Sequence, residues 1–201
     1  FGAAVELAEV RSVDLSSNPK VLQSSEGTFY GKTVVIATGA VPRTLGLPEE
    51  QALTGRGLHY CAACDGMFYR GKTVVVVGGG NSAAADALLL SRVAKKVIVV
   101  HRRDTLRAEK IYHEPLKNAK NVEFRWNSEA VRFPHGDRLT GIRIRNKLSG
   151  TEEEIPCDGV FISVGRRPAP TLFEDQHKLD EQENLVADET TATELPGVYA
   201  V

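Results

Sequence analysis

The stretch "KTVVVVGGGNSAAADALLL", residues 72–90, decides the fold. Its four valines predict a buried strand, and the alanines and leucines of residues 82–94 predict a helix. The run "VIVV" at residues 97–100 predicts a second strand, so residues 72–100 read as strand, helix, strand, the unit of a parallel sheet with a right-handed crossover. Within the helix, four positions are expected to share one face: Ala84, Ala87, Leu88 and Ser91.

The loop GGGNSA between strand and helix has the spacing G-x-G-x-x-A of a dinucleotide-binding loop. Gly78 would permit the tight turn, Gly80 would let the backbone approach a pyrophosphate, and the small Ala83 would let the helix pack close to the strand. Asn81 or Ser82 is expected to cap the helix, whose N-terminus favours an anion. The alternative reading is an ordinary structural turn.

The end of the second strand indicates which dinucleotide is bound. An NAD site usually carries an acid about 20 residues after the glycine loop, where it holds the ribose 2′-hydroxyl. This chain instead has His101, Arg102 and Arg103 there, with Arg107 one helical turn further on. Guanidinium groups bind a 2′-phosphate that a carboxylate would repel, so NADPH is favoured over NADH. The alternative is a solvated basic helix start.

The run "CAACDG" at residues 61–66 has three readings: a redox disulfide, half of a zinc site, or a pair of buried thiols. Zinc needs four ligands, and neither Cys157 nor the histidines supply a second pair, so no metal is expected. A redox pair of Cys61 and Cys64 explains more, with Asp65 able to move a proton. A disulfide needs an intermediary to take a hydride from NADPH, usually a flavin. Cys157 is expected to be a small buried apolar residue.

Elsewhere the pattern is less regular. Residues 32–36 predict a buried strand, residues 44–57 a connector, and residues 104–114 a helix that Pro115 stops or kinks. Residues 171–201 are acidic and end in a short apolar run. Antiparallel strands are expected at three places: residues 122–126, 142–145 and 160–164.

Composition excludes several classes of protein. The chain has 201 residues, a formal net charge of −1 and three cysteines. The interspersed charges give no nucleic-acid surface, no apolar run is long enough to span a membrane, and few cysteines favour the cytoplasm. The chain begins at Phe1 in mid-pattern and its only methionine is Met67, so we expect it to be part of a longer protein.

The run "CAACDGMFYRGKTVVVVGGGNSAAADALLL" followed by "VHRRDTLRAEK" resembles the NADPH domain of low-molecular-weight, bacterial-type thioredoxin reductase. The flanks agree: "VVIATGAVPRTLGLP" precedes it, and "DGVFISVGRRPAPTLF" and "TTATELPGVYAV" follow it. The similarity covers nearly the whole chain. It implies an α/β fold, with a Rossmann-like NADPH-binding domain (a parallel sheet plus an antiparallel meander) and part of an FAD-binding domain of the same class.

The resemblance also implies roles for residues by position. Cys61 and Cys64 match the redox-active disulfide, and Asp65 matches the acid beside it. The NADPH residues would be Gly78, Gly80, Asn81, Ser82 and Ala83 at the pyrophosphate, and His101, Arg102, Arg103 and Arg107 at the 2′-phosphate. Thr38 and Gly39 match a loop against FAD. Electrons would pass from NADPH through FAD and the disulfide to thioredoxin, in a cytoplasmic enzyme that is a homodimer.

The implied domains are residues 1–43 (part of the FAD domain), 44–167 (the NADPH domain with the disulfide) and 168–201 (the return segment of the FAD domain). Residues 40–45 and 165–170 would be hinge strands that let this domain rotate. Two FAD motifs of the family, a glycine loop upstream and a Gly-Asp pair downstream, are missing from the chain. Ala85 and Asp86 stand where the family often has two glutamates.

Two other functions share much of this pattern. One is the reductase component of an alkyl hydroperoxide system, which would carry a thioredoxin-like N-terminal extension. The other is a non-catalytic NADP-binding fragment, which would hold no FAD. A dithiol oxidase that does not use pyridine nucleotide is disfavoured by Arg102, Arg103 and Arg107.

Overall fold

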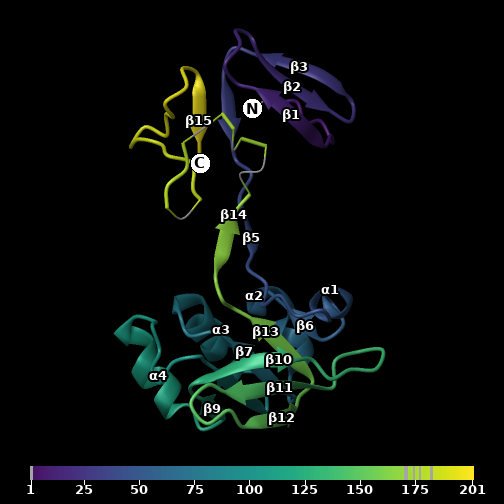
Figure 1. Ribbon diagram of the computed structural model, residues 1–201, viewed down its shortest axis with the longest axis vertical. Coiled ribbons are helices and arrows are strands. Elements are labelled where there is room, and N and C mark those ends of the chain that lie inside the picture. Colours follow the sequence, from purple (N-terminus) through teal and green to yellow (C-terminus); the bar gives the residue numbers. More distant parts are fainter. Residues whose placement is uncertain (1, 170–171, 174, 177, 182) are drawn as a thin grey trace. The chain divides into compact units, whose positions relative to one another are not determined.

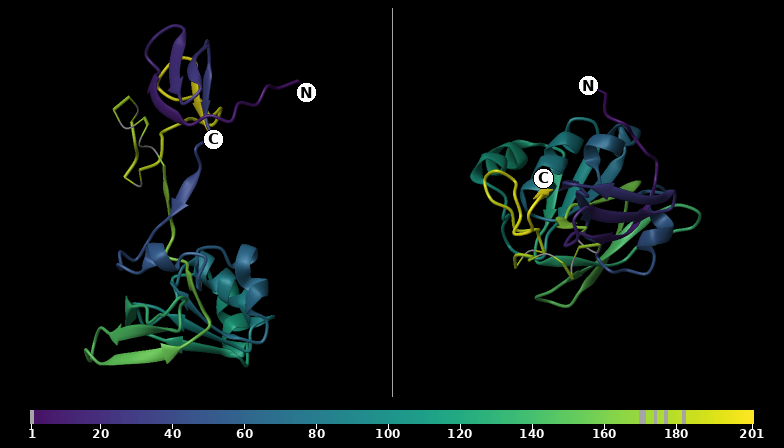
Figure 2. Two further views of the ribbon diagram at one scale, coloured as in Figure 1. Left: turned by 90° about the vertical axis from the view of Figure 1, so that its right-hand side faces the viewer. Right: turned by 90° about the horizontal axis from the view of Figure 1, so that it is seen from above.

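The computed structural model describes residues 2–169, 172–173, 175–176, 178–181 and 183–201 (Figures 1 and 2). The chain divides into two compact units. The larger runs from Pro42 to Gly165, and the smaller combines the chain up to Val41 with the chain from Arg166 onward. The larger unit holds both the glycine loop and the cysteine pair.

A five-stranded parallel sheet forms the centre of the larger unit. Its strands lie in the order β6 (Leu58–His59), β13 (Gly159–Ile162), β7 (Thr73–Val77), β8 (Lys96–Val100) and β9 (Val122–Arg125). Every neighbouring pair is parallel. Helix α3 (Asn81–Ser91) connects β7 to β8, so the predicted strand–helix–strand unit is confirmed.

The valines of β7 are buried on both faces of this sheet. Val74 and Val76 pack in the cluster that includes α3, while Val75 and Val77 pack in the cluster that includes the antiparallel strands. Two-sided burial explains why the strand is a continuous apolar run instead of an alternating one. Three layers result, with helices on one face of the parallel sheet and an antiparallel sheet on the other (Figure 1).

The buried face of α3 is rotated from the one that the sequence suggested. Two of the four positions expected to share it are only half-buried, Leu88 and Ser91. The face consists of Ala83, Ala84, Ala87 and Leu90. Small alanines at three of these positions let the helix lie close to the sheet.

The antiparallel sheet contains β10 (Ser128–Arg132), β11 (Gly141–Asn146) and β12 (Glu152–Pro156), in that order. The prediction for residues 142–145 is confirmed, because they lie in β11. The prediction for residues 122–126 and 160–164 is wrong: they contribute β9 and β13 to the parallel sheet. A short apolar run does not reveal strand direction, which here depends on partners distant in sequence.

The chain around Pro115 also differs from expectation. In place of one helix over residues 104–114 there is a 3₁₀ turn, η2 (Lys110–Tyr112), followed by α4 (His113–Asn118). Pro115 lies inside the first turn of α4 and does not end it. A proline is tolerated there because amides of the first turn have no partner within the helix.

The connector before the cysteines is more ordered than its composition suggested. It contains α1 (Glu50–Leu53), whose first residue is buried. The Glu50 carboxylate accepts hydrogen bonds from the backbone N–H groups of Leu45 at 3.0 Å and Leu47 at 2.8 Å, and from the Tyr60 hydroxyl at 2.9 Å. Glu50 therefore fixes the connector to the residue that precedes Cys61.

The smaller unit is built from short strands. One antiparallel sheet contains β1 (Val10–Asp14), β2 (Lys20–Ser24) and β3 (Gly27–Gly31). In a second sheet, β4 (Val34–Ile36) pairs in parallel with β15 (Val198–Ala200). In a third, β5 (Ala40–Pro42) pairs with β14 (Arg166–Pro168).

The expected strand at residues 32–36 exists but is not fully buried, because Val35 is 61% exposed. The hinge strand expected over residues 165–170 includes residue 170, which lies outside the described residues. No helix in the described part of the chain is long and apolar enough to cross a membrane.

Candidate active site

The glycine loop is shaped by close contacts within the larger unit. Gly78 has a φ of +147°, and a side chain there would meet the Ser163 carbonyl oxygen at 2.3 Å. At Gly79 a side chain would meet the ring of His101 at 2.4 Å, whereas Gly80 faces open space. The sequence interpretation assigned no role to Gly79; its necessity comes from a ring 22 positions away, which no local pattern reveals.

The first turn of α3 is left without a side-chain cap. Gly80 is the N-cap residue, so the expectation that Asn81 or Ser82 caps the helix is wrong. The Asn81 amide instead donates to Glu109 Oε1 at 2.9 Å, and its oxygen accepts from the Glu109 backbone N–H at 2.8 Å. The backbone N–H of Arg107 donates to the Gly79 carbonyl at 2.7 Å. These bonds hold the loop that carries Arg107 against the glycine loop.

A cavity of about 940 Å³ opens where three parallel strands end. It is lined by residues 78–82 after β7, by residues that follow β8, by residues 128–130 of β10, and by residues 163–165 after β13. The carboxyl edge of a parallel sheet is where such folds bind nucleotides. The uncapped start of α3 lies at this edge and offers backbone N–H groups to an anion.

The cationic residues differ in their relation to this cavity. Arg102 and Arg107 line it, whereas Arg103 is not among the lining residues. His101 is only 6% exposed, and burial together with the charges of Arg103 and Arg102 lowers its pKa, so the ring is neutral at physiological pH. Its buried Nε2 has no hydrogen-bond partner among the described residues. A buried orphan atom at the rim of a cavity fits a site that a polar ligand completes.

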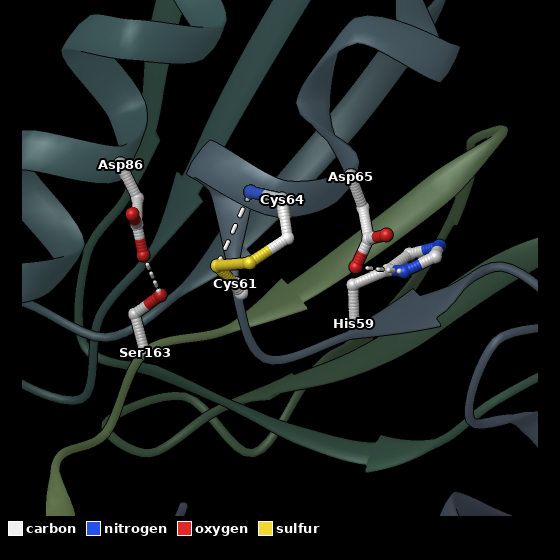
Figure 3. The surroundings of a disulfide bond; sticks show 6 residues. All are labelled: His59, Cys61, Cys64, Asp65, Asp86 and Ser163. Carbon is white, nitrogen blue, oxygen red and sulfur yellow. Dashed lines mark hydrogen bonds and ion pairs between the residues drawn. A yellow bond between two sulfur atoms is a disulfide. The ribbon is translucent and has the colours of Figure 1, made fainter. Parts of the chain in front are cut away.

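The cysteines are joined in a disulfide, which confirms the pairing that the resemblance implied (Figure 3). Their Cα atoms lie 5.3 Å apart at the start of α2 (Ala62–Asp65). The Sγ of Cys61 accepts a hydrogen bond from the backbone N–H of Cys64 at 3.2 Å. Cys64 is exposed and Cys61 is half-buried.

The Asp65 carboxylate is in contact with a buried histidine, His59. Its Oδ2 lies 2.9 Å from Nδ1 of His59, and Nε2 of His59 lies 2.6 Å from the Tyr69 hydroxyl (Figure 3 shows the first contact). Tyr69 ends η1 (Gly66–Tyr69), the 3₁₀ turn after α2. Sequence reasoning considered His59 only as a zinc ligand and missed this contact. A histidine six residues before an acid carries no recognisable signal.

Asp86 and Ser163 form a second polar pair beside the disulfide. The Ser163 hydroxyl donates to the Asp86 carboxylate at 2.5 Å, and burial raises the pKa of Asp86 while this bond lowers it. In Figure 3 the pair lies on the opposite side of the disulfide from Asp65. Ser163 also lines the large cavity, so the neighbourhoods of the disulfide and the cavity meet at this residue.

Three predicted residues remain: Thr38 and Gly39 belong to the smaller unit, and Cys157 belongs to the larger one. Thr38 and Gly39 follow β4 in the smaller unit, where Gly39 has a φ of +66° and the Thr38 hydroxyl donates to the Ala169 carbonyl at 3.4 Å. Cys157 is a free, buried thiol, as expected, and burial raises its pKa to about 12. A thiol with that pKa is inert at neutral pH.

Comparisons with known proteins agree with this geometry. The family model described as pyridine nucleotide-disulphide oxidoreductase matches residues 3–201. The chain is 43% identical over 202 residues to a thioredoxin reductase of Streptomyces clavuligerus, covering 100% of this chain and 63% of that protein. It is 38% identical over 201 residues to one of Listeria monocytogenes, again covering 100% of this chain and 63% of that protein.

Solved structures give the same result. The thioredoxin reductase of Lactococcus lactis matches with a TM-score of 0.88 at 33% identity, covering 96% of this chain and 64% of that one. That of T. acidophilum matches with a TM-score of 0.86 at 33% identity, covering the same shares. The chain thus spans a little under two thirds of the length of the relatives it matches.

Proposed function

Because the chain belongs to the pyridine nucleotide-disulphide oxidoreductase family, we propose that it is the central part of a thioredoxin reductase that uses NADPH and FAD. One observation carries this proposal: a disulfide and an arginine-lined dinucleotide cavity occur on the same folded unit. The names of the relatives support thioredoxin as the electron acceptor. A cytoplasmic homodimer is part of the same proposal.

NADPH would be held by residues at the carboxyl edge of the parallel sheet. The pyrophosphate would lie against Gly78, Gly80 and the start of α3 (Asn81, Ser82 and Ala83), whose N–H groups and dipole favour an anion. The 2′-phosphate would be bound mainly by Arg102 and Arg107, because these guanidinium groups line the cavity. Arg103 would add longer-range attraction, and neutral His101 would contribute a hydrogen bond but no charge.

Thr38 and Gly39 would form one edge of the FAD site. When bound, FAD would convert hydride transfer from NADPH into reduction of the disulfide. The residues of this chain then have two tasks. Cys61 and Cys64 take up two electrons as the S–S bond breaks, and Asp65 exchanges a proton with the sulfur atoms.

The experiment is an assay of the complete protein with NADPH and a bacterial thioredoxin. We expect NADPH oxidation that depends on thioredoxin, and the Cys61→Ser and Cys64→Ser variants should lose it while still binding NADPH. Oxidation of NADPH without reduction of thioredoxin would contradict the proposal. Transfer to a peroxidase disulfide in place of thioredoxin would favour the alkyl hydroperoxide reductase alternative.

A further inference from the structure

The residue His59 occupies an unusual position for a polar side chain. It is 8% exposed, yet both of its ring nitrogens have a partner: Asp65 at 2.9 Å and the Tyr69 hydroxyl at 2.6 Å. Its ring stacks on Phe161 with 5.3 Å between centroids and meets Tyr69 edge-on at the same distance. Contacts on so many sides leave the ring one orientation, and this orientation directs Nδ1 at Asp65.

Tyr69 is itself held firmly. A side chain at Gly159 would meet the Tyr69 ring at 2.3 Å, so the glycine provides the space that this ring fills. Burial raises the pKa of Tyr69, the charge of Arg138 opposes that effect, and the charge of Asp65 adds to it. The phenol is therefore protonated at neutral pH and donates its hydrogen to Nε2 of His59. Since Nε2 accepts, Nδ1 carries the ring proton and donates it to Asp65.

Other charged groups face this network. Arg138 shares the cavity of about 430 Å³ that His59, Asp65 and both cysteines line. Asp158 interacts electrostatically with Tyr69, and the Lys72 ammonium lies 5.5 Å from the centroid of the Tyr69 ring. Of all these groups, His59 is the one in direct contact with the Asp65 carboxylate.

We propose that His59 is a positioning residue: its Nδ1–H holds the Asp65 carboxylate in the orientation from which it influences the neighbouring cysteine sulfurs. This inference rests on the proposed function, in which reduction of the disulfide (two electrons and two protons yielding two thiols) requires a group that manages protons. Without the bond, Asp65, whose side chain is already 33% exposed, turns toward water, where its charge is screened.

Two substitutions separate positioning from mere packing. In His59→Asn the amide nitrogen takes the place of Nδ1 and keeps the bond to Asp65. In His59→Gln the amide nitrogen takes the place of Nε2, so the bond to Asp65 is lost while a polar contact with Tyr69 remains. Both replace an aromatic ring with an amide, so the loss of stacking is shared by the two variants.

The primary measurement is the pH dependence of alkylation by iodoacetamide in the complete protein, reduced anaerobically with dithiothreitol. Asp65→Asn removes a negative charge beside Cys64 and should lower the alkylation midpoint by about 0.5–1 pH unit. His59→Gln should shift it in the same direction, and His59→Asn should retain the wild-type midpoint. In the Asp65→Asn background, His59→Gln should have no further effect.

Equal midpoint shifts in His59→Asn and His59→Gln, or a further shift in the double variant, would overturn the proposal. This assay uses neither NADPH nor thioredoxin. A wild-type protein that fails to reduce thioredoxin would refute the proposed function, whereas only the alkylation comparison decides the role of His59.

A second measurement needs no variant and so does not depend on their folding. In ¹⁵N-histidine-labelled wild-type protein, NMR should show a proton on Nδ1 of His59, with the ring assigned by its nuclear Overhauser contacts to the rings of Tyr69 and Phe161. At neutral pH Nε2 should carry no proton. An unprotonated Nδ1 with a protonated Nε2 would contradict the proposal, which depends on Nδ1–H donating to Asp65.

Discussion

Replacing Arg102 by alanine should weaken NADPH binding far more than replacing Arg103. The two residues are adjacent, have the same side chain and follow the same strand, so one is a matched control for the other. Of the two, Arg102 lines the cavity at the carboxyl edge of the parallel sheet, whereas Arg103 is not among its lining residues. The sequence alone gave them equal weight.

The magnitude follows from the type of contact each guanidinium can make. A direct hydrogen bond between charged groups contributes about 1.5–3 kcal/mol, so losing it should raise the dissociation constant about 10- to 150-fold. An exposed charge acting through solvent contributes about 1 kcal/mol or less, so Arg103→Ala should cause a loss of about fivefold or less. Arg107→Ala should resemble Arg102→Ala, since Arg107 also lines the cavity.

Isothermal titration of the complete protein with 2′,5′-ADP and with AMP measures this directly, because the two ligands differ only in the 2′-phosphate. Arg102→Ala should lose affinity for 2′,5′-ADP and keep its affinity for AMP, and the difference should diminish at high salt. Equal losses for the two ligands would contradict a 2′-phosphate role. Equal losses in the Arg102 and Arg103 variants would refute the distinction drawn from the cavity.

Three further predictions concern stability and reactivity. In the reduced, folded protein, iodoacetamide at pH 8 should label Cys61 and Cys64 but not Cys157, whose pKa is about 12; mass spectrometry showing three labels before denaturation would contradict this. Because burial raises the pKa of Asp86 above its unfolded value, ionisation of Asp86 reduces stability as pH rises. Asp86→Asn should thus melt higher than wild type at pH 8 and lose that advantage below pH 4, and a pH-independent difference would argue against the shift. Glu50→Gln should lower the free energy of unfolding by about 2–4 kcal/mol in urea titration, because a charged acceptor of three hydrogen bonds is replaced by an amide; an unchanged midpoint would show that the connector does not depend on it.

The strand–helix–strand unit could be predicted because its determinants are local. Four successive valines indicate a strand covered on both faces, and the glycine loop indicates a turn into a helix. The directions of β9 and β13 could not be read in this way, since each is fixed by neighbours far away in sequence. The prediction that Pro115 ends a helix failed because the effect of a proline depends on where the helix begins. Here α4 begins at His113, so Pro115 lies in its first turn.

For the candidate site, residue type was predictable and contact was not. The sequence predicted which cysteines form the pair, whereas the role of the arginines at a 2′-phosphate stays a prediction. It did not show that His101 packs against Gly79, that Asp86 meets Ser163, or that His59 meets Asp65. The first contact joins the segments that follow β8 and β7, and the second joins α3 to the segment that follows β13. The third joins β6 to α2, so it depends on how the chain turns between them.

The order of the strands accounts for the closeness of the two centres. The cysteine loop follows β6 and the glycine loop follows β7, and in the sheet these strands are separated only by β13. Neighbouring strands lie about 4.8 Å apart, so the carboxyl ends of β6 and β7 are separated by about 10 Å. Ser163 follows β13 between them and contacts both Asp86 and the cavity. A parallel sheet with β13 inserted at this point therefore brings the disulfide and the glycine loop to one edge, although η1 and the whole of β7 lie between them in the sequence.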